Sequence, residues 1–439
     1  MAGTLIIGGR VIDPATGLDA TRDVAIDAGG RVSSIGTDLE RSAADEVIDA
    51  SGLIVAPGLI DPHVHLREPG GEHKETIETG AAAAVAGGFT TVCCMPNTSP
   101  ALDTPEMIRA VAKRAEEVAA CRVFAVGCGT VGRKGESLAE IAGMSKAGAV
   151  GISDDGDVIA DAGIMQRVLL ATRDAGLAFM QHCQEPSLTR GAAMHAGSVS
   201  ARHGITGWPR VAEELIIERD IRLTASLAGG PCAYHVQHMS SGNSVELIRR
   251  ARESGLPVSA EASPHHLLLT HEDIETADGR LDTAFKMNPP LRERSDCDVL
   301  RDAVAEGVIS VLATDHAPHT ADEKSAPFEA APFGIIGLET ALGGYAKALI
   351  ETGAIDWPKL IELLTLAPAK LCGLDSQGLG QLKVGGPADI TLIDPAQKWS
   401  LAERDLAGKS RNTPFVGWEF PARAVRTIVR GVTAWHQGT

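Results

Sequence analysis

The chain has 439 residues, which is enough for a large core and for two structural units. It carries 57 acidic and 40 basic residues, a formal net charge of −17 at pH 7 and no basic run, so nucleic acid or an anionic membrane is not expected as a partner. It contains no signal-peptide pattern, no apolar stretch of membrane-span length and no CxxC pair among its eight cysteines. We therefore expect a cytoplasmic protein with reduced thiols.

Both ends of the chain predict β-structure. Residues 3–57 contain short strand-like runs separated by Gly and Asp-Pro turn signals, without a helical period. Similar runs return at 388–395 and 422–438. We expect the two ends to pair into a small β-sandwich domain, built from residues 1–56 and 377–439, beside a larger domain at 57–376.

The middle of the chain alternates strand-like apolar runs with Ala-rich helical stretches, which is the pattern of βαβ units. The eight predicted strands lie at 53–61, 89–96, 122–127, 149–153, 177–182, 233–238, 256–262 and 308–315. The predicted helices lie at 75–87, 104–119, 136–147, 161–175, 211–228, 243–254, 296–306 and 337–350. Eight right-handed units predict an α/β protein with a TIM-type (β/α)8 barrel. The alternative is an open doubly wound sheet, for which the chain offers no GxGxxG or P-loop turn.

Five of these strands end in side chains that bind metals. His63 and His65 stand one residue apart at the end of the first strand and therefore face the same side. The other strand ends carry Asp154, Asp155, His182, His238 and Asp315, with His316 and His319 just beyond. Because a barrel gathers its strand ends at one face, these nitrogen and carboxylate ligands suit one or two zinc-like ions.

Each candidate ligand also has a plainer interpretation. The HxH pair, His182 and His238 could be core histidines with satisfied hydrogen bonds. Asp154 and Asp155 precede a glycine and could form a turn, and Asp315 could cap a helix. We expect Asp155 to be a ligand and Asp154 to have a turn or supporting role.

Arg67 continues the face of His63 and His65 and offers a planar fork for a carboxylate. A metal beside such a group suggests an enzyme that acts on an acidic small molecule, although Arg67 could also form a surface ion pair. Residues 318–333 are polar, contain Pro and lack a strand or helix period. We expect this segment to be a mobile lid that closes over the substrate.

Several motifs together carry a family resemblance. They are DPHVHLREPG at 61–70, MPNT at 95–98, ISDDG at 152–156, QH at 181–182, QHMS at 237–240, NPPLR at 288–292, ATDHAPH at 313–319 and SRNTPF at 410–415. With these motifs the chain resembles, over nearly its whole length, the long bacterial dihydroorotases of the amidohydrolase superfamily. The resemblance implies zinc-dependent, reversible cyclisation of N-carbamoyl-L-aspartate to (S)-dihydroorotate, the third step of de novo pyrimidine (UMP) biosynthesis.

The resemblance also implies a division of labour among the metal ligands. The first zinc would be held by His63, His65, Asp155 and Asp315, and the second by Asp155, His182 and His238. A hydroxide bridging the metals would be the nucleophile in the hydrolytic direction, with Asp315 as general base and then acid. Many relatives bridge the metals with a carbamylated lysine on strand four. Here Asp155 stands in its place and the nearest lysine is Lys146, so both one and two zinc ions per subunit stay open.

The implied substrate contacts surround these ligands. They are His65, Arg67, Asn97, Asn288 and His319, together with the backbone around Phe333 and Gly334. The resemblance further implies a homodimer or larger oligomer and leaves open a complex with aspartate transcarbamoylase.

Two other functions compete with this interpretation. Hydantoinases, dihydropyrimidinases and allantoinases share the barrel and the HxH motif, but they typically carry the bridging lysine and bind substrates without this carboxylate. Asp155, Arg67 and Asn97 therefore favour a dihydroorotase. A non-catalytic scaffold for aspartate transcarbamoylase would have lost metal ligands, whereas all six are present here.

Overall fold

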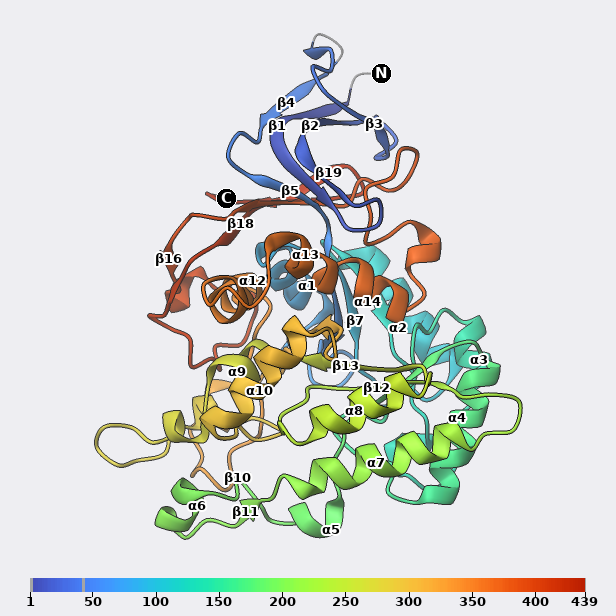
Figure 1. Cartoon of the computed structure of the whole chain (residues 1–439), viewed down its shortest axis with the longest axis vertical. Helices are drawn as coiled ribbons and strands as arrows, with labels where there is room; N and C mark the ends of the chain where they lie inside the picture. The colour runs from blue at the N-terminus through green and yellow to red at the C-terminus, as the bar shows by residue number, and fades with distance from the viewer. Residues whose placement is uncertain (1–2, 42–43, 439) are drawn as a thin grey trace.

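One sheet joins the two ends of the chain in the computed structural model, which describes residues 3–41 and 44–438 (Figure 1). Its strands are β1 (Thr4–Asp13), β2 (Leu18–Ile26), β3 (Val32–Gly36), β4 (Glu46–Asp49), β5 (Ile54–Pro57), β15 (Ile390–Asp394), β18 (Arg423–Val429) and β19 (Val432–His436). Their order is β19-β18-β15-β5-β1-β2-β3, with β4 parallel to β1. β5 and β15 pair antiparallel, so the first and last parts of the chain stabilise each other.

The central strands are parallel and form two shorter sheets. The first contains β6 (Leu59–Val64), β7 (Phe89–Cys94) and β8 (Arg122–Ala125). The second contains β9 (Ala178–Gln181), β12 (Ala233–Val236), β13 (Val258–Ala262) and β14 (Val311–Leu312). Isolated parallel bridges join Ile152 to Gly127 and to Phe179, and Val64 to His316.

Three predicted strands differ from the observed ones. The first splits at Gly58, and its two halves join different sheets, β5 beside β15 and β6 beside β7. Only glycine fits at this point, because a Cβ would lie 2.0 Å from Thr90 Oγ1. The fourth forms no named strand, because Ile152 makes only single bridges before the chain turns at Asp154. The eighth shortens to Val311–Leu312.

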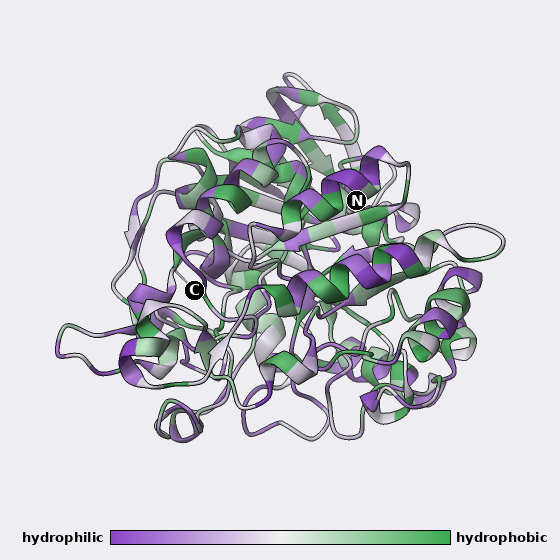
Figure 2. Cartoon of the chain, turned by 60° about the horizontal axis from the view of Figure 1, so that its bottom comes forward, coloured by the Kyte–Doolittle hydropathy of each residue, from purple (hydrophilic) through white to green (hydrophobic). Residues whose placement is uncertain are grey.

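Eight helical segments follow the central strands at the predicted places. They are α1 (Ile77–Ala86), α2 (Pro105–Val118), α3 (Ile141–Lys146), α4 (Ala162–Asp174), α7 (Val211–Ala225), α8 (Ser244–Glu253), α10 (Arg294–Ala305) and α12 (Ala341–Tyr345), which continues into η5 (Ala346–Ile350). On α8, Val245, Ile248 and Ala251 are buried at the spacing of one helix face. Figure 2 shows the same mixture of hydrophobic and hydrophilic residues on the surface helices.

The sequence did not predict the remaining elements. The helices among them are α5 (Pro186–Thr189), α6 (Ser198–His203), α9 (Pro264–Leu268), α11 (Ala321–Lys324), α13 (Trp357–Leu364), α14 (Leu366–Leu371), η2 (Val131–Arg133), η3 (His271–Ile274), η4 (Thr283–Phe285), η6 (Asp375–Gln377) and η7 (Glu403–Asp405). The strands are β10 (Met194–His195), β11 (Gly207–Trp208), β16 (Trp399–Ser400) and β17 (Glu419–Phe420). Helix α11 corrects the expectation of a helix-free segment at 318–333: Thr320 caps it, and it is too short to show a helical period.

The core contains the cysteine thiols as well as the apolar side chains. All eight cysteines lie in the described part of the chain, and each is a buried free thiol. Burial raises the pKa of Cys94 and of Cys121 to about 12, so these thiols are unreactive near neutral pH. Within residues 3–41 and 44–438, no helix combines the length and the apolar character that crossing a membrane requires.

Candidate active site

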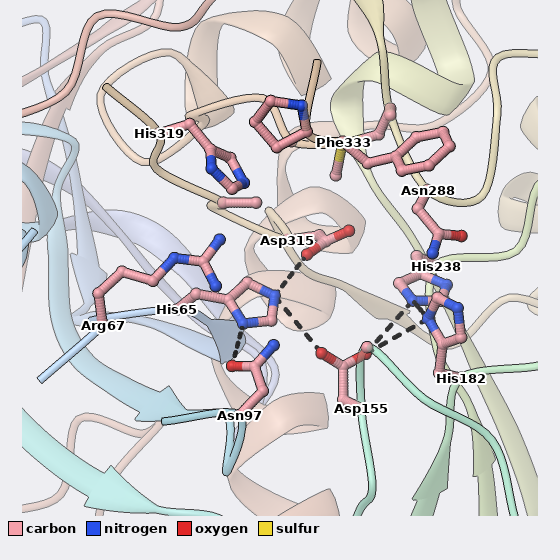
Figure 3. Close-up of a pocket in the computed structure, with 15 residues that line it drawn as sticks. His65, Arg67, Asn97, Asp155, His182, His238, Asn288, Asp315, His319 and Phe333 are labelled. Carbon is pink, nitrogen blue, oxygen red and sulfur yellow. Dashed lines mark hydrogen bonds and ion pairs between the residues drawn. The ribbon is translucent and has the colours of Figure 1, made fainter. Parts of the chain in front are cut away.

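A cavity of about 320 Å³ opens at the carboxyl ends of the central strands (Figure 3). The predicted residues that line it are His65, Arg67, Asn97, Asp155, His182, His238, Asn288, Asp315, His319, Phe333 and Gly334. His63 lies behind this lining and is fully buried. The structure thus gathers every predicted site residue around one cavity.

Asp155 lies at the centre of the histidines. Its Oδ1 is 3.5 Å from His63 Nε2, from His182 Nδ1 and from His238 Nε2, and its Oδ2 is 3.5 Å from His65 Nε2. Burial alone would raise the pKa of Asp155, but the charge of His63 and the hydrogen bonds from His182 and His238 hold it well below its usual range. This carboxylate is therefore ionised and contacts all four imidazoles.

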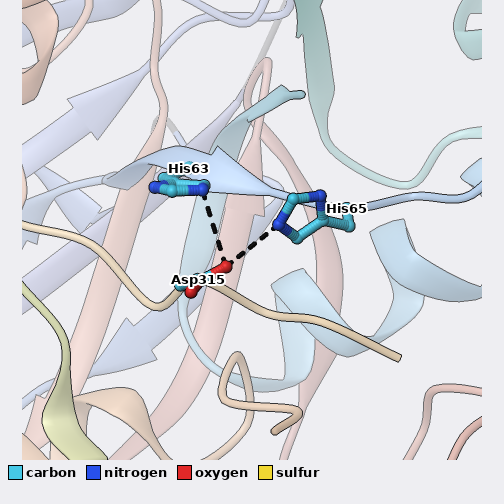
Figure 4. A group of neighbouring side chains, drawn as sticks. All are labelled: His63, His65 and Asp315. Atoms are coloured by element: carbon cyan, nitrogen blue, oxygen red, sulfur yellow. Dashed lines mark hydrogen bonds and ion pairs between the residues drawn. The ribbon is translucent and has the colours of Figure 1, made fainter. Parts of the chain in front are cut away.

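Asp315 faces the two histidines of the first strand (Figure 4). Its Oδ1 lies 3.0 Å from His65 Nε2 and 3.5 Å from His63 Nε2. Burial opposes ionisation of Asp315, but the His63 charge and the His65 hydrogen bond outweigh it and lower the pKa to about 2. A second ionised carboxylate therefore faces the same imidazoles as Asp155.

The far nitrogens of three site histidines have their own partners. His63 Nδ1 lies 2.6 Å from Glu261 Oε1, and His65 Nδ1 lies 2.9 Å from Asn97 Oδ1. His182 Nε2 lies 2.9 Å from Gln184 Oε1. Such bonds fix the ring and its tautomer, so that the other nitrogen points toward the cluster.

Glu261 was not among the residues predicted from the sequence. It is almost fully buried on β13, and it also accepts from the His238 backbone N–H at 3.1 Å and lies 3.0 Å from His235 Nε2. Burial raises the pKa of Glu261, but the charge of His63 and the hydrogen bonds from His63 and His235 lower it further, so that it falls well below the usual value. The sequence did hold a signal for Glu261, since it is a carboxylate inside the apolar run at 256–262. An ionised group buried there needs a charged partner.

The residues around Asp155 fit a metal ion. Two groups have ligand atoms that all lie within 4.8 Å of one another: His63 with His65 and Asp315, and His63 with Asp155 and His238. His63 Nε2 is buried and has no hydrogen-bond partner among the described residues. Imidazole nitrogens with carboxylate oxygens are a donor set for zinc-like divalent ions.

Asp154 points away from this cluster. Its Oδ1 accepts from the backbone N–H groups of Gly129 and Thr130 at 2.8 and 3.1 Å, and its Oδ2 accepts from the Thr130 hydroxyl. Asp154 therefore orders the turn that carries Asp155, whereas Asp155 faces the histidines.

Three site residues adopt left-handed backbone conformations. The φ angles are 59° at Arg67, 30° at His238 and 47° at Asp315. This region is unfavourable for side chains with a Cβ, and such residues often occur where a fold holds functional groups in place.

The opposite side of the cavity carries the predicted substrate contacts. Burial lowers the pKa of Arg67 to about 10, so its guanidinium stays charged at neutral pH, and its Nε donates to Pro318 O at 3.2 Å. Burial and the nearby charges of Arg67 and Lys74 lower the pKa of His319 to about 3, which makes its imidazole neutral. Asn288 Nδ2 donates to Gln184 Oε1 at 3.4 Å. This wall therefore offers one cation and several neutral polar groups.

Asn412, from the SRNTPF motif, ties the far wall together. Its Nδ2 donates to Ala317 O at 2.9 Å and to Gly334 O at 3.0 Å, while its Oδ1 accepts from the His319 backbone N–H at 2.9 Å. The C-terminal part of the chain therefore helps to shape the cavity.

Comparison with known proteins identifies the family. A sequence model described as "Dihydro-orotase-like" matches residues 52–244. The dihydroorotase of Geobacter sp. (strain M21) is 44% identical over 434 residues, which cover 99% of each chain. That of Bacillus caldolyticus is 44% identical over 409 residues and 93% of each chain. The chain belongs to the dihydroorotase family.

Dihydroorotases are hydrolases that act on cyclic amides, and the cavity carries the candidate metal groups that such metal-dependent enzymes need. Among solved structures, the L-hydantoinase from Arthrobacter aurescens aligns with a TM-score of 0.87 over 100% of this chain and 97% of its own, at 24% identity. This similarity shows that a dihydroorotase and a hydantoinase share a fold. The assignment to the dihydroorotase family rests on the sequence relatives.

Proposed function

We propose that this chain is a zinc-dependent dihydroorotase that interconverts N-carbamoyl-L-aspartate and (S)-dihydroorotate. The proposal rests on the side chains that meet in one cavity. Asp155 contacts four imidazoles on one side, and the charged Arg67 lines the same cavity. A metal-type cluster beside a fixed cation suits a cyclic amide that bears a carboxylate.

The metal ligands proposed are those of the central cluster. They are His63, His65, Asp155, His182, His238 and Asp315. Zinc supplies, when bound, Lewis-acid polarisation of the amide carbonyl and a water that is acidic near neutral pH. Because Asp155 contacts all four histidines, its carboxylate would help to hold whichever ions these histidines bind.

We assign proton transfer to Asp315. In the hydrolytic direction, water adds to the ring amide carbonyl carbon and gives its proton to the carboxylate of Asp315. The bond to the ring nitrogen then breaks, and Asp315 returns the proton to that nitrogen, which becomes the terminal amide of the carbamoyl group. Because Asp315 has a pKa near 2, it is ready to accept a proton at neutral pH, although it is a weak base.

We assign substrate orientation to the wall opposite the cluster. Arg67 would hold the substrate carboxylate, and Asn97 and His319 would donate or accept at its edge. Asn288 and the backbone at Phe333 and Gly334 would contact the ring amides. These side chains place the amide carbonyl over the cluster and fix the reacting face.

We also infer the domain organisation. The parallel bridges of Ile152 to both neighbours and of Val64 to His316 support closure of residues 57–376 into a (β/α)8 barrel. The shared terminal sheet supports a β-sandwich domain formed by 1–56 and 377–439. The eight buried free thiols support a reducing compartment such as the cytoplasm. Homo-oligomers and a complex with aspartate transcarbamoylase stay predictions.

The test is an assay of the purified protein with its metal content measured. Bound zinc together with turnover of N-carbamoyl-L-aspartate and dihydroorotate, and much slower turnover of hydantoin and dihydrouracil, is the expected result. Preference for hydantoin or dihydrouracil would replace the proposal with a hydantoinase-type activity. Zinc-free protein without turnover would favour a scaffold.

A further inference from the structure

Two lysines near the cavity are buried. Lys286 is 2% exposed and Lys324 is 8% exposed. Within the part of the chain that the structure describes, neither ammonium group forms an ion pair with a carboxylate. Each donates to backbone carbonyl oxygens instead, and almost all of these belong to one segment, residues 328–334.

Lys286 binds the first part of segment 328–334. Its Nζ donates to Phe328 O at 2.6 Å, to Glu329 O at 3.0 Å and to Ala331 O at 2.6 Å. The same nitrogen lies 4.5 Å from the centroid of the Phe333 ring, which favours a cation. All three donors of the ammonium are therefore used.

Lys324 binds the second part of the segment. Its Nζ donates to Pro332 O and to Gly334 O, both at 3.0 Å, and to Lys286 O at 3.4 Å. The Gly334 N–H donates to Lys286 O at 2.8 Å. The two lysines and the segment thus form one connected set of hydrogen bonds.

Segment 328–334 forms part of the cavity wall. Pro332, Phe333 and Gly334 line the cavity, and so does Asn288, two residues after Lys286. Gly334 has φ +150°, and a Cβ there would lie 2.5 Å from Ala317 O. The backbone at this point is therefore closely packed against Ala317.

Burying these two charges costs stability. Burial lowers the pKa of Lys286 to about 8 and that of Lys324 to about 7, because the ammonium form is less well solvated inside the protein. Apolar side chains of similar length would fill this space at lower cost. The advantage of the two lysines must therefore lie in how their amino groups position the backbone of segment 328–334.

We propose that Lys286 and Lys324 are positioning residues for the substrate, which fix the backbone of segment 328–334 so that Phe333 and Gly334 meet the ring amides. This inference rests on the proposed function, which gives that wall its substrate. The two lysines contact no residue of the metal cluster. Their loss therefore acts on substrate binding and leaves metal binding intact.

The experiment compares Lys286→Met and Lys324→Met with Lys398→Met in the full-length zinc-loaded protein. Lys398 is a matched control because its side chain is 70% exposed. We expect KM for dihydroorotate to rise about tenfold or more in both buried-lysine variants, since each loses its hydrogen bonds to the backbone of segment 328–334. Zinc content stays at the wild-type level, and kcat changes less than KM.

Hydrogen exchange gives a readout that does not depend on activity. We expect amide exchange in segment 328–334 of the substrate-free protein to be about tenfold faster in the two variants, and unchanged in Lys398→Met. Unchanged exchange and KM would overturn the inference, as would a loss of zinc and kcat at constant KM. If either Met variant fails to fold, Lys286→Gln and Lys324→Gln keep donors at these positions and are judged by the same two measurements.

The outcomes also separate this inference from the proposed function. A wild-type protein that does not convert dihydroorotate refutes the proposed function. The anchoring of segment 328–334 by the two lysines then stands if exchange in the segment accelerates in the variants, and falls if it does not.

Discussion

The two sides of the cavity are built by different means. On one side the metal-type ligands follow parallel strands, and their carboxylates and imidazoles hold one another within 3.5 Å. On the other side, segment 328–334 contains no strand, and three side chains from elsewhere in the chain bind its backbone. These are Lys286, Lys324 and Asn412.

This difference suggests a separation of tasks. The ligand side is rigid because neighbouring strands and opposite charges fix each side chain. On the far side, single side chains hold the backbone of segment 328–334, and each can be substituted without altering the strands. Variants of the first side should therefore change metal binding or kcat, and variants of the second should change KM.

The largest effect is expected from Asp315→Asn. Asparagine keeps the shape of the side chain beside His65 but cannot carry a proton. We expect kcat to fall by about 100-fold or more while zinc stays bound. Steady-state kinetics and metal analysis check this, with Asp322→Asn on the exposed start of α11 as the control. Near-normal turnover would remove Asp315 from proton transfer.

Glu261→Gln tests the support of the ligand side. Glutamine can still accept from the His238 N–H, but it removes the charge that faces His63 Nδ1. We expect zinc affinity to fall by about 10- to 100-fold, as measured by competition with a chelator. Glu253→Gln at the exposed end of α8 is the control. An unchanged affinity would show that Glu261 has only a structural role.

Arg67→Lys tests the far side. Lysine keeps the charge but loses the planar fork that grips a carboxylate at two points. We expect KM for dihydroorotate to rise about tenfold or more, with zinc content unchanged. Arg109→Lys, on the exposed side of α2, should leave KM as it is. If KM is the same in both variants, the substrate carboxylate binds elsewhere.

The smallest effect concerns pH and Lys324. Burial lowers the pKa of Lys324 to about 7, whereas in the unfolded chain it is about 10.4. Between these values the unfolded chain binds the extra proton, so the Lys324 contribution to stability rises with pH, by at most about 1.4 kcal/mol per pH unit.

Lys324→Met removes that contribution. The free energy of unfolding of the wild type should therefore increase relative to Lys324→Met from about pH 7 to about pH 9. Chemical denaturation of the zinc-loaded proteins at each pH measures this, with Lys398→Met as the control. A difference that does not change with pH would mean that Lys324 keeps an ordinary pKa in the folded protein.

The ligand side could be predicted from the sequence because two periodicities determine it. Alternation along a strand places His63 and His65 on one face, and the βα repeats place His182, His238 and Asp315 at equivalent strand ends. Strand length was less predictable, since Ile152 pairs with both neighbours through single bridges and gives no long apolar run.

The support of the far side could not be predicted in the same way. A lysine in a sequence is expected at the surface, and Lys324 follows two acidic residues in a polar segment. The carbonyl groups that bind Lys286 and Lys324 carry no sequence signal, because every residue has one. Only the folded backbone shows that these oxygens converge on the two ammonium groups.

The position of Asn412 has a consequence for synthesis. All six proposed metal ligands precede it in the chain, and a ribosome releases the N-terminal part of a protein first. A nascent chain therefore possesses the complete ligand set before it has the side chain that ties His319 to Gly334. Removing the C-terminal segment would therefore leave all six proposed ligands in the chain but take away the side chain that joins the His319 backbone to Gly334.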